Sequence, residues 1–245
     1  MELKVLNSGS KANGYVLQND TEAIVIECGC PVSDCLQAVN FQSSKIVACL
    51  VSHEHGDHAK HIEKYMEYMP VYCSKGTAEA ITYKSKRRPT VLRCFQKLVA
   101  GNFVIQTFDT QHDSAEPFGF VIEHPEIGKL LFATDTYYIK YKFDNLTNVM
   151  IECNYDKDIL NENVYNGLLH PVVQERTIRS HMEIDTTIKT LKDNDASHLN
   201  QVVLLHLSGN NASPEEFQKR VSLAIGKCVS VAHKGLNLIV NKTPF

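Results

Sequence analysis

Hydrophobic positions along the chain follow two periods, and the alternation between them predicts the order of helices and strands. Short alternating or wholly apolar runs bounded by turn-forming residues are typical of strands. Such runs occur at Leu3–Leu6, Tyr15–Gln18, Ala23–Glu27, Ile46–Val51, Val91–Arg93, Phe103–Phe108, Gly119–Glu123, Leu130–Ala133, Gln201–Leu205 and Leu236–Val240. Helical spacing, by contrast, predicts helices at Val32–Val39, His58–Met69, Lys157–Gly167, Gln174–Ser180, Ile184–Asp193 and Pro214–Ala224.

This order of elements predicts an α/β protein in which two β layers are flanked by helices. No internal repeat, low-complexity stretch or Pro/Gly-rich linker divides the chain. With 245 residues and 43% hydrophobic content, the chain is long enough to bury a substantial core. We therefore expect one domain over residues 1–245.

Charge and targeting signals narrow the function classes. The net charge of -3 gives no reason to expect a surface that coats nucleic acid throughout. The basic run Lys84–Arg88 lacks interleaved aromatic residues, which favours a solvated loop over a phosphate-binding track. Met1–Lys4 leads directly into a strand, and no apolar run is long enough to cross a bilayer. We expect a soluble, cytoplasmic protein with no membrane partner.

The eight cysteines are scattered along the chain, and without an export signal they are expected to be reduced thiols. Cys28, Cys30 and Cys35 lie close together in sequence. Their spacing lacks the paired Cys-x-x-Cys pattern of structural zinc. We therefore do not expect a cysteine metal site.

The densest chemical signal follows the apolar run Ile46–Val51, where His53, His55, Asp57 and His58 fall within six residues. Imidazole and carboxylate groups are the ligands that zinc and similar metals favour. In a turning loop, the side chains of His53 and His55 can face one ion and those of Asp57 and His58 another. The sequence therefore predicts a metal site in the loop between a strand and a helix.

Three more polar residues end apolar runs further along the chain. They are His112, Asp135 and His206. Each alone would be unremarkable as a loop residue or a satisfied core residue, but the same pattern of apolar strand followed by a ligand recurs. Ends of strands at one edge of a layered fold are common places for a site, so we expect these residues to join the histidine cluster.

The cluster, the lone histidine, the strand-terminal aspartate and the final strand-terminal histidine resemble the motif series of the metallo-β-lactamase superfamily. The resemblance implies an αββα four-layer sandwich of two mixed β-sheets flanked by helices. It also implies that His53, His55 and His112 hold one divalent ion, that Asp57, His58 and His206 hold a second, and that Asp135 bridges them. The family's first motif usually ends in aspartate; here Glu27 stands at that position, one methylene longer, with an implied role in bracing the ligand loop.

Finer motifs resemble the WalJ/YycJ-type exonuclease branch of that superfamily. The matching motifs are Ser8-Gly9-Ser10-x-x-Asn13, His112-Asp113, Pro117-x-Gly119-Phe120, Asp135-Thr136, Glu152-x-Asn154 and His206-Leu207-Ser208-x-x-Asn211. Two motifs depart from the branch: Asn154-Tyr155-Asp156 stands where Asn-His-Asp is usual, and Ser180-His181-Met182-Glu183 where Gly-His-Leu-Ser is usual.

The resemblance implies a dinuclear metal-dependent phosphodiesterase, with a 5′ to 3′ DNA exonuclease using a metal-bridging hydroxide as the specific expectation. The two ions would be zinc, with manganese or iron as alternatives. A hydrolase of cyclic nucleotides or other small phosphodiesters is the alternative enzyme, and a non-catalytic metal-binding regulatory protein is the alternative of another class. The substrate partner would be nucleic acid or a nucleotide phosphodiester, and a homodimer is one oligomeric state that the sequence leaves open.

Further residues receive roles on this basis. Asp57 and His181 are the expected catalytic groups, His181 as a proton donor, although a helix-capping surface histidine explains His181 equally well. Glu152, like Glu27, would support the ligands. The expected substrate-binding residues are Ser8, Ser10, Asn13 and Asn211; a tight hairpin and a helix cap are the alternative explanations for these positions.

Overall fold

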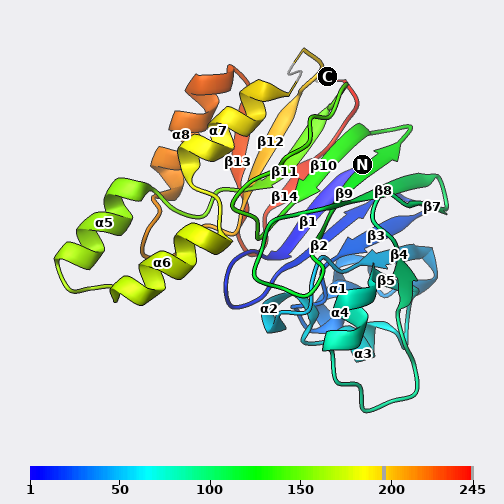
Figure 1. The fold of residues 1–245 in the computed structure, drawn as a ribbon. Coiled ribbons are helices and arrows are strands. Elements are labelled where there is room, and N and C mark those ends of the chain that lie inside the picture. The colour runs from blue at the N-terminus through cyan, green and yellow to red at the C-terminus, as the bar shows by residue number, and fades with distance from the viewer. Residues whose placement is uncertain (195–196, 244–245) are drawn as a thin grey trace.

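Two seven-stranded sheets form the centre of the computed structural model, which describes residues 1–194 and 197–243 (Figure 1). The first sheet has the spatial order β14 (Asn237–Ile239), β1 (Glu2–Asn7), β2 (Gly14–Gln18), β3 (Ala23–Ile26), β4 (Ile46–Leu50), β5 (Val71–Ser74) and β6 (Thr90–Leu92). The second has the order β13 (Cys228–Val231), β12 (Gln201–Leu205), β11 (Asn148–Glu152), β10 (Gly128–Ala133), β9 (Phe118–His124), β8 (Phe103–Asp109) and β7 (Lys97–Ala100).

Each sheet is antiparallel in one half and parallel in the other. In the first sheet, β14, β1, β2 and β3 are antiparallel neighbours, whereas β3, β4, β5 and β6 run parallel. In the second, β7 to β10 are antiparallel and β10 to β13 are parallel. Parallel strands send their carboxyl ends to the same edge, so the segments that follow β10, β11 and β12 start at one edge of the second sheet.

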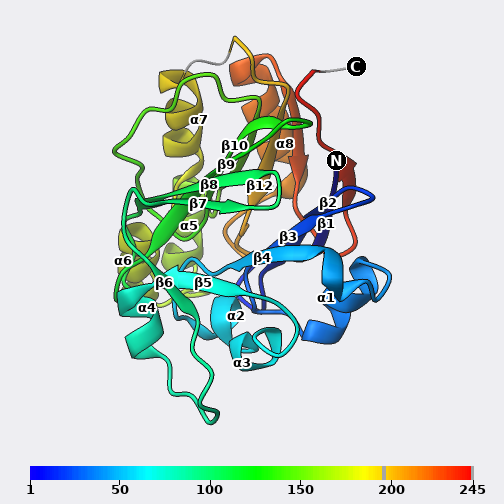
Figure 2. The same ribbon diagram turned by 90° about the vertical axis from the view of Figure 1, so that its right-hand side faces the viewer.

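Helices flank the two sheets. On the side of the first sheet lie α1 (Val32–Ala38), α2 (Gly56–Ala59), α3 (Ile62–Tyr65) and α4 (Lys75–Ala80) (Figure 2). On the side of the second lie α5 (Lys157–Tyr165), α6 (Pro171–Ser180), α7 (Ile184–Asp193) and α8 (Pro214–Ile225). Helices α7 and α8 run along the second sheet, whereas α5 and α6 project to one side of it (Figure 1).

Alternate side chains of the inner strands enter different cores, which explains why these strands read as nearly continuous apolar runs. In β10, Leu130 and Phe132 join the core between the sheets, whereas Leu131 and Ala133 join the core under α7 and α8. In β3, Ile24 enters the central core and Val25 packs toward the helices of the first sheet. The predicted fold class, two mixed sheets flanked by helices, is therefore confirmed.

One predicted helix, His58–Met69, is wrong as a continuous element. The structure has α2 and then α3, with His61 at φ -107° and ψ 12° between them. The backbone oxygen of Asp57 accepts from the Asn13 amide, and the amide of His61 donates to the Cys28 oxygen. The i to i+4 bond between Asp57 and His61 is thus replaced by tertiary bonds, and the helix breaks there.

Several elements escaped prediction. They are β5, β7, β11, β13 and α4. All are short, and a short apolar run does not distinguish a strand from other buried backbone until a neighbour pairs with it. β11 is the most consequential of them, because it is fully buried between β10 and β12 and ends at Glu152.

Two further expectations concern the cysteines and the helices. All eight cysteines are free. Among the described residues, none of the helices combines the length and apolar character needed to cross a bilayer. The assignment of residues 1–245 to one domain stays a prediction.

Candidate metal centre

Ligand-type side chains from both sheets meet where their strands end. The loop after β4 carries His53 and His55, and the following helix α2 carries Asp57 and His58. The segment after β8 carries His112. Asp135 follows β10, and His206 follows β12. Their ligand atoms form two adjoining groups, in each of which all atoms lie within 4.8 Å of one another.

The first ligand group consists of His53, His55 and His112. Nε2 of His112 lies 3.1 Å from Nδ1 of His55. Two nitrogens bound to one tetrahedral zinc ion at its usual bond length are separated by about 3.3 Å, so this spacing suits a shared ion. In the described part of the chain, the buried Nε2 of His53 has no hydrogen-bond partner, which is costly unless a cation occupies its lone pair.

The second ligand group consists of Asp57, His58, Asp135 and His206. An Asp57 carboxylate oxygen lies 3.2 Å from Nε2 of His58 and 3.4 Å from Nε2 of His206. These two imidazoles and the carboxylate converge on one point. The mixture of nitrogen and oxygen donors fits zinc, manganese or iron.

Asp135 belongs to both groups through different oxygens. Oδ2 faces the first group, 3.9 Å from Nε2 of His53 and 3.6 Å from Nε2 of His112. Oδ1 faces the second, 3.5 Å from Nε2 of His58 and 3.6 Å from Nε2 of His206. This is the placement that a carboxylate bridging two ions needs.

The outer nitrogen of several ligand histidines is held by a neighbour, which leaves the inner nitrogen for a metal. Nδ1 of His53 lies 2.8 Å from the Ser52 hydroxyl. Nδ1 of His112 donates to the backbone oxygen of Ser180 at 2.9 Å. These contacts fix each ring in the orientation that metal binding requires.

Glu27 reaches the ligands despite its extra methylene. It is fully buried; Oε2 accepts from the Ser52 amide at 3.3 Å and Oε1 lies 3.5 Å from Nδ1 of His58. The carboxylate thus connects the residue that orients His53 with the second ligand group. The geometry agrees with the bracing role expected for this position.

Glu152 joins three segments of the site from the end of β11. Its Oε1 lies 2.7 Å from Nδ1 of His181 and 3.4 Å from Nδ1 of His206. Its Oε2 accepts from the amides of Thr136 and Met182, at 2.7 and 3.2 Å. One buried carboxylate therefore fixes a ligand histidine, the backbone after Asp135 and the segment that carries His181.

Backbone strain concentrates at these strand ends. Glu27, Asp135 and His206 have φ of 70°, 47° and 54°, in the left-handed region that non-glycine residues rarely adopt. Such conformations persist only where surrounding contacts enforce them, and they gather at functional sites. Here they turn strand-terminal side chains toward the two ligand groups.

Two of the residues expected to bind substrate instead hold the ligands. Asn13 is fully buried, and its Nδ2 lies 3.2 Å from an Asp57 carboxylate oxygen and 3.0 Å from Nε2 of His58. The Ser8 hydroxyl accepts from the amide of His206 at 3.0 Å. These contacts favour positioning roles over substrate contacts.

The other two candidates for substrate binding differ from each other. Ser10 is exposed on the loop between β1 and β2, where substrate binding stays a prediction. Asn211 is buried, and its side chain bonds Asn163 and Ser208. These bonds join the loop before α8 to α5, which favours a structural role.

The loop between β3 and α1 approaches both the ligand loop and the loop between β1 and β2 very closely at Gly29. A Cβ added to Gly29 would lie 1.7 Å from the backbone oxygen of Asp57 and 2.7 Å from the Asn13 amide. That oxygen accepts from the Asn13 amide at 2.7 Å. Only glycine allows these backbones to meet and to fix Asp57.

His181 caps the end of α6 through its backbone amide, which donates to the Thr177 oxygen, while its side chain lies in the site. It follows α6, its ring stacks on His206 with centroids 5.3 Å apart and planes at 12°, and it is part of a third group with Asp135, Glu152 and His206. Its side chain keeps 21% exposure, so it is reachable from solvent. Its catalytic role stays a prediction.

The charges of the two ligand groups differ. Burial lowers the pKa of His53, and the adjacent His58 lowers it further. Burial also lowers the pKa of His112, more than the Asp135 carboxylate raises it. In the second group, burial opposes protonation of His206, but Asp135 and hydrogen bonds to Asp57 and Glu152 prevail and raise its pKa to about 10.

The pKa values of His58 and Asp57, in the second group, are also set by a balance between burial and neighbouring charges. Burial disfavours a charged His58, but the Asp135 and Glu27 carboxylates outweigh it and hold the pKa of His58 well above its usual range. Burial raises the pKa of Asp57, whereas bonds from His206 and His58 outweigh this and hold it well below its usual range.

Sequence reasoning gave no individual role to Ser52 or Asn154. Asn154 donates through Nδ2 to the backbone oxygen of His206 at 2.7 Å, and the same Nδ2 lies 3.1 Å from Nδ1 of that ring. Its place in the Glu152-x-Asn154 motif was a usable signal. Ser52 offered none beyond its position before His53.

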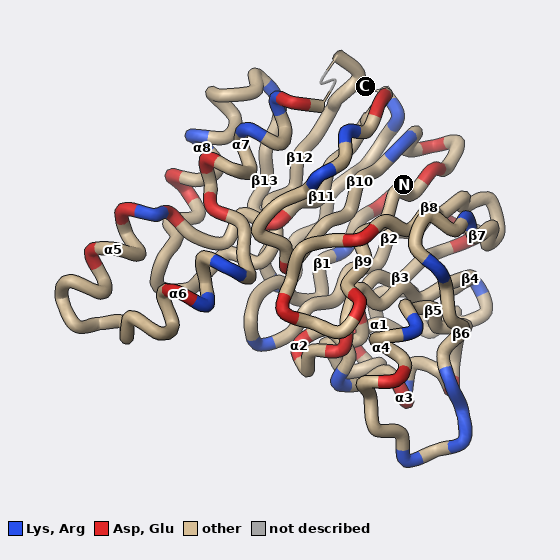
Figure 3. The backbone as a smooth tube through the Cα atoms, in the orientation of Figure 1, with Lys and Arg blue, Asp and Glu red and all other residues tan. Residues whose placement is uncertain are grey.

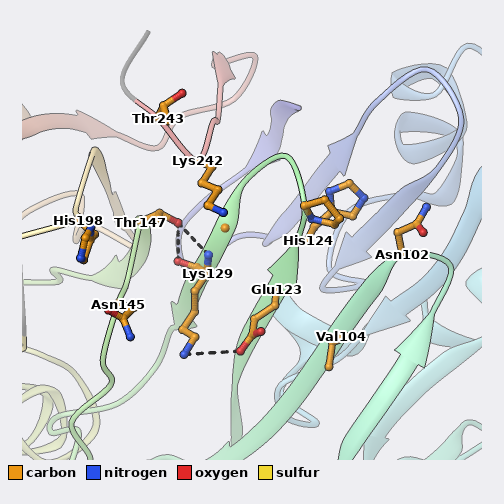
Figure 4. A pocket seen from close by; sticks show the side chains of 12 residues that line it. Asn102, Val104, Glu123, His124, Lys129, Asn145, Thr147, His198, Lys242 and Thr243 are labelled. Atoms are coloured by element: carbon orange, nitrogen blue, oxygen red, sulfur yellow. Dashed lines mark hydrogen bonds and ion pairs between the residues drawn. The ribbon is translucent and has the colours of Figure 1, made fainter.

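Two other surface features lie apart from the ligands. A cavity of about 700 Å³ opens at the other end of β9, where Glu123, His124 and Lys129 line it (Figure 4). The basic run Lys84–Arg88 forms an exposed loop beyond α4 (Figure 3). Arg88 donates to the backbone oxygens of Ser85 and Arg87, and Arg87 to that of Met66 at the end of α3, in keeping with the predicted solvated loop.

The candidate metal groups of the described residues contain no cysteine. A four-layer sandwich that brings these two histidine and aspartate groups together at strand ends is the architecture of the metallo-β-lactamase fold. The family model described as "Beta-lactamase superfamily domain" matches residues 31–207. The chain therefore belongs to the beta-lactamase superfamily, as the motifs predicted.

The chain is also similar to individual proteins. Exodeoxyribonuclease WalJ of Streptococcus pneumoniae is 25% identical over 178 residues, which cover 66% of this chain and 65% of that relative, just under two thirds of its length. The fold resembles YhfI of Bacillus subtilis, a metallo-β-lactamase fold protein, with TM-score 0.75, 18% identity and coverage of 97% and 98% of the two chains. It also resembles a diphosphatase of the PhnP family, with TM-score 0.69, 15% identity and coverage of 97% of each chain.

Proposed function

We propose that the protein is a metal-dependent phosphodiesterase and that its substrate is DNA, which it degrades as an exonuclease from the 5′ end. The observation that carries the proposal is the division of Asp135 between two ligand groups, since a carboxylate in that position could serve two ions at once. Two-ion sites are typical of phosphoryl-transfer enzymes. The similarity to a protein named as an exodeoxyribonuclease supports DNA as the substrate.

The residues present fit two divalent ions. His53, His55 and His112 would hold one and Asp57, His58 and His206 the other, with Asp135 shared. When bound, such ions supply an activated water and neutralise charge on the phosphate. The donor set suits zinc, and manganese or iron as alternatives.

His181 is the proposed proton donor to the leaving oxygen. Burial lowers its pKa, but the Glu152 carboxylate 2.7 Å away outweighs burial, so the pKa of His181 is raised and the protonated ring is favoured. Glu152 holds Nδ1, which leaves Nε2 to donate. Replacement of His181 by alanine should slow DNA hydrolysis by about a hundredfold, in the range of a lost general acid.

A comparison of leaving groups isolates that role. Nitrophenolate leaves without protonation, so His181→Ala should hydrolyse bis(p-nitrophenyl) phosphate at nearly the wild-type rate. DNA has an alkoxide leaving group and should show the full loss. Equal losses on both substrates would show that His181 positions the site instead of donating a proton.

The test of the proposed function begins with elemental analysis of protein purified without chelator. The metal found is then supplied in assays on single-stranded DNA, double-stranded DNA, RNA and cyclic nucleotides, with DNA labelled at either end to reveal polarity. Asp135→Asn serves as the matched inactive control. A protein that binds metal but hydrolyses none of these substrates would be a metal-binding regulatory protein, and the proposal would fail.

A hydrolase of cyclic nucleotides or other small phosphodiesters is the second candidate. The net charge of -3 favours it, because a long polyanion gains little from such a surface. The structural likeness to a PhnP-family diphosphatase is a likeness of fold and does not choose between the two. A higher kcat/KM on cyclic nucleotides than on DNA would select this candidate.

A further inference from the structure

The segment that leaves the metal centre after Asp135 carries aromatic and basic side chains in alternation. Its sequence is Tyr137-Tyr138-Ile139-Lys140-Tyr141-Lys142. Basic and aromatic side chains together are the combination that many proteins use to bind single-stranded nucleic acid, because bases stack on the rings while cations meet the phosphates. The basic loop at residues 84–88 lacks this alternation of rings and cations.

The start of this segment is fixed against the site. The amide of Tyr137 donates to the backbone oxygen of Gln111, the residue before His112. The hydroxyl of Thr136 accepts from the amide of Gln111 and donates to the backbone oxygen of Tyr138. Both tyrosines are thus held within three residues of Asp135 by bonds to the segment that supplies another metal ligand.

The two tyrosine side chains are nevertheless free. Tyr137 and Tyr138 are 44% and 49% exposed, whereas Ile139 is 5% exposed and anchors the segment in the core under α7. Across residues 1–194 and 197–243, neither tyrosine makes a side-chain hydrogen bond or a ring contact. Large exposed rings on a rigid backbone lose little entropy when a ligand stacks on them.

The two lysines are placed differently. Lys140 pairs with Asp109 at 2.5 Å, so its charge is already balanced. Lys142 is exposed and forms no ion pair with any described residue. Lys142 is therefore an exposed cation without an ion pair among the described residues, four residues after Tyr138.

We propose that Tyr137 and Tyr138 form a stacking platform for the bases of a single-stranded polynucleotide whose phosphodiester lies at the metal centre, with Lys142 contacting its backbone. This proposal rests on the proposed phosphodiesterase function and narrows its substrate to an unpaired strand. Base stacking also explains how a chain of net charge -3 could retain a polyanion. Small cyclic nucleotides would use no more than one of the two rings.

The test measures binding of fluorescent oligodeoxythymidylates with phosphorothioate linkages, which resist hydrolysis, to the metal-loaded protein. The same oligonucleotides with abasic sites in place of the bases form the second arm. Tyr137→Leu and Tyr138→Leu should each weaken binding about tenfold and the double variant about a hundredfold. Tyr165→Leu, which removes a ring 90% exposed on α5, is the matched control and should bind as wild type.

The abasic arm separates stacking from misfolding. The wild-type protein should bind the abasic strand as weakly as the double variant binds the normal strand, and the double variant should no longer distinguish them. Lys142→Ala should lower the slope of log affinity against log salt by about 0.7, as expected for one lost phosphate contact. Thermal unfolding of every variant checks that the fold is intact.

The outcomes separate the two proposals. If the double variant keeps full base-dependent affinity while DNA is hydrolysed, the platform is overturned and the phosphodiesterase function stands. If base-dependent binding is lost in the double variant yet no phosphodiester is hydrolysed by the wild type, the platform is supported and the proposed activity fails. Equal affinity of the wild type for normal and abasic strands also overturns the platform.

Discussion

The two ligand groups differ in where their charge comes from. The first consists of three histidines and meets only one oxygen of Asp135. The second contains Asp57 and Asp135 and lies against the buried Glu27 and Glu152.

The difference in carboxylate content decides how the two ligand groups are protonated in the metal-free protein. Buried carboxylates need a counter-charge, and in the second group protons on His58 and His206 supply it, since the pKa values of both are raised. In the first group burial lowers the pKa values of His53 and His112. An ion that enters the second group must therefore displace protons, whereas the lowered pKa values of His53 and His112 favour metal binding at those two rings without proton release.

The largest expected effect comes from removing what the groups share. Asp135→Asn takes away the charge that faces both groups, so we expect both ions to bind more weakly and DNA hydrolysis to fall roughly a thousandfold. Elemental analysis and turnover assays measure the two quantities. Asp193→Asn, at the exposed end of α7, is the control. Wild-type metal content with wild-type rates would contradict the bridging role.

Glu152→Gln should weaken metal binding in the second ligand group and not in the first. The variant keeps the shape of the side chain but removes the charge beside His206 and His181. We expect the second ion to bind about tenfold to a hundredfold more weakly, as is typical when a partner of a ligand histidine is lost. Competition with a chromophoric chelator resolves the two binding steps. Equal weakening of both steps would argue against separate groups.

The affinities of the two ligand groups for metal should depend differently on pH. Because the pKa of His206 is raised to about 10, its proton stays bound until the pH approaches that value, and metal must compete with it below. Affinity for the second ion should rise about tenfold per pH unit for each proton released between pH 7 and 9. Affinity for the first should change little, since the pKa values of His53 and His112 are lowered. Calorimetry in buffers of different ionisation enthalpy counts the protons; release of none at the second step would refute the prediction.

The same raised pKa affects the metal-free protein. A group whose folded pKa exceeds its unfolded value stabilises the fold fully below the unfolded pKa and loses that contribution as pH rises through the folded pKa. For His206 the loss falls between its ordinary value and about 10. The metal-free protein should therefore show a falling unfolding temperature over that window, and the metal-loaded protein a smaller fall.

The smallest effect is expected at Ser52. Ser52→Ala removes a neutral hydroxyl 2.8 Å from Nδ1 of His53. Loss of one such hydrogen bond corresponds to about a threefold to tenfold weaker first ion, less than the loss of a charged partner at the second. The chelator competition described for Glu152→Gln measures it. A larger effect on the second ion than on the first would be inconsistent with the assignment.

Some features of the site could be predicted from the amino-acid sequence alone. His53, His55, Asp57 and His58 are close in sequence, so their grouping needed no tertiary information. His112, Asp135 and His206 were found because each ends an apolar run, and parallel strands bring their carboxyl ends to one edge. The fold class followed from the same alternation of strands and helices.

The sequence by itself thus determined the ligand types and the layered fold, because both depend on local periodicity and on residues at strand ends. Only the tertiary structure decided that Asp135 divides its oxygens, that Asn13 and Ser8 support the ligands, and that His181 stacks on His206. The tertiary structure also divides the predicted helix His58–Met69 into α2 and α3, since Asn13 and Cys28 take the bonds that a continuous helix would use. These outcomes depend on contacts between segments far apart in the chain. The interaction energy of such contacts is set by distance and burial in the folded protein and not by the local sequence pattern.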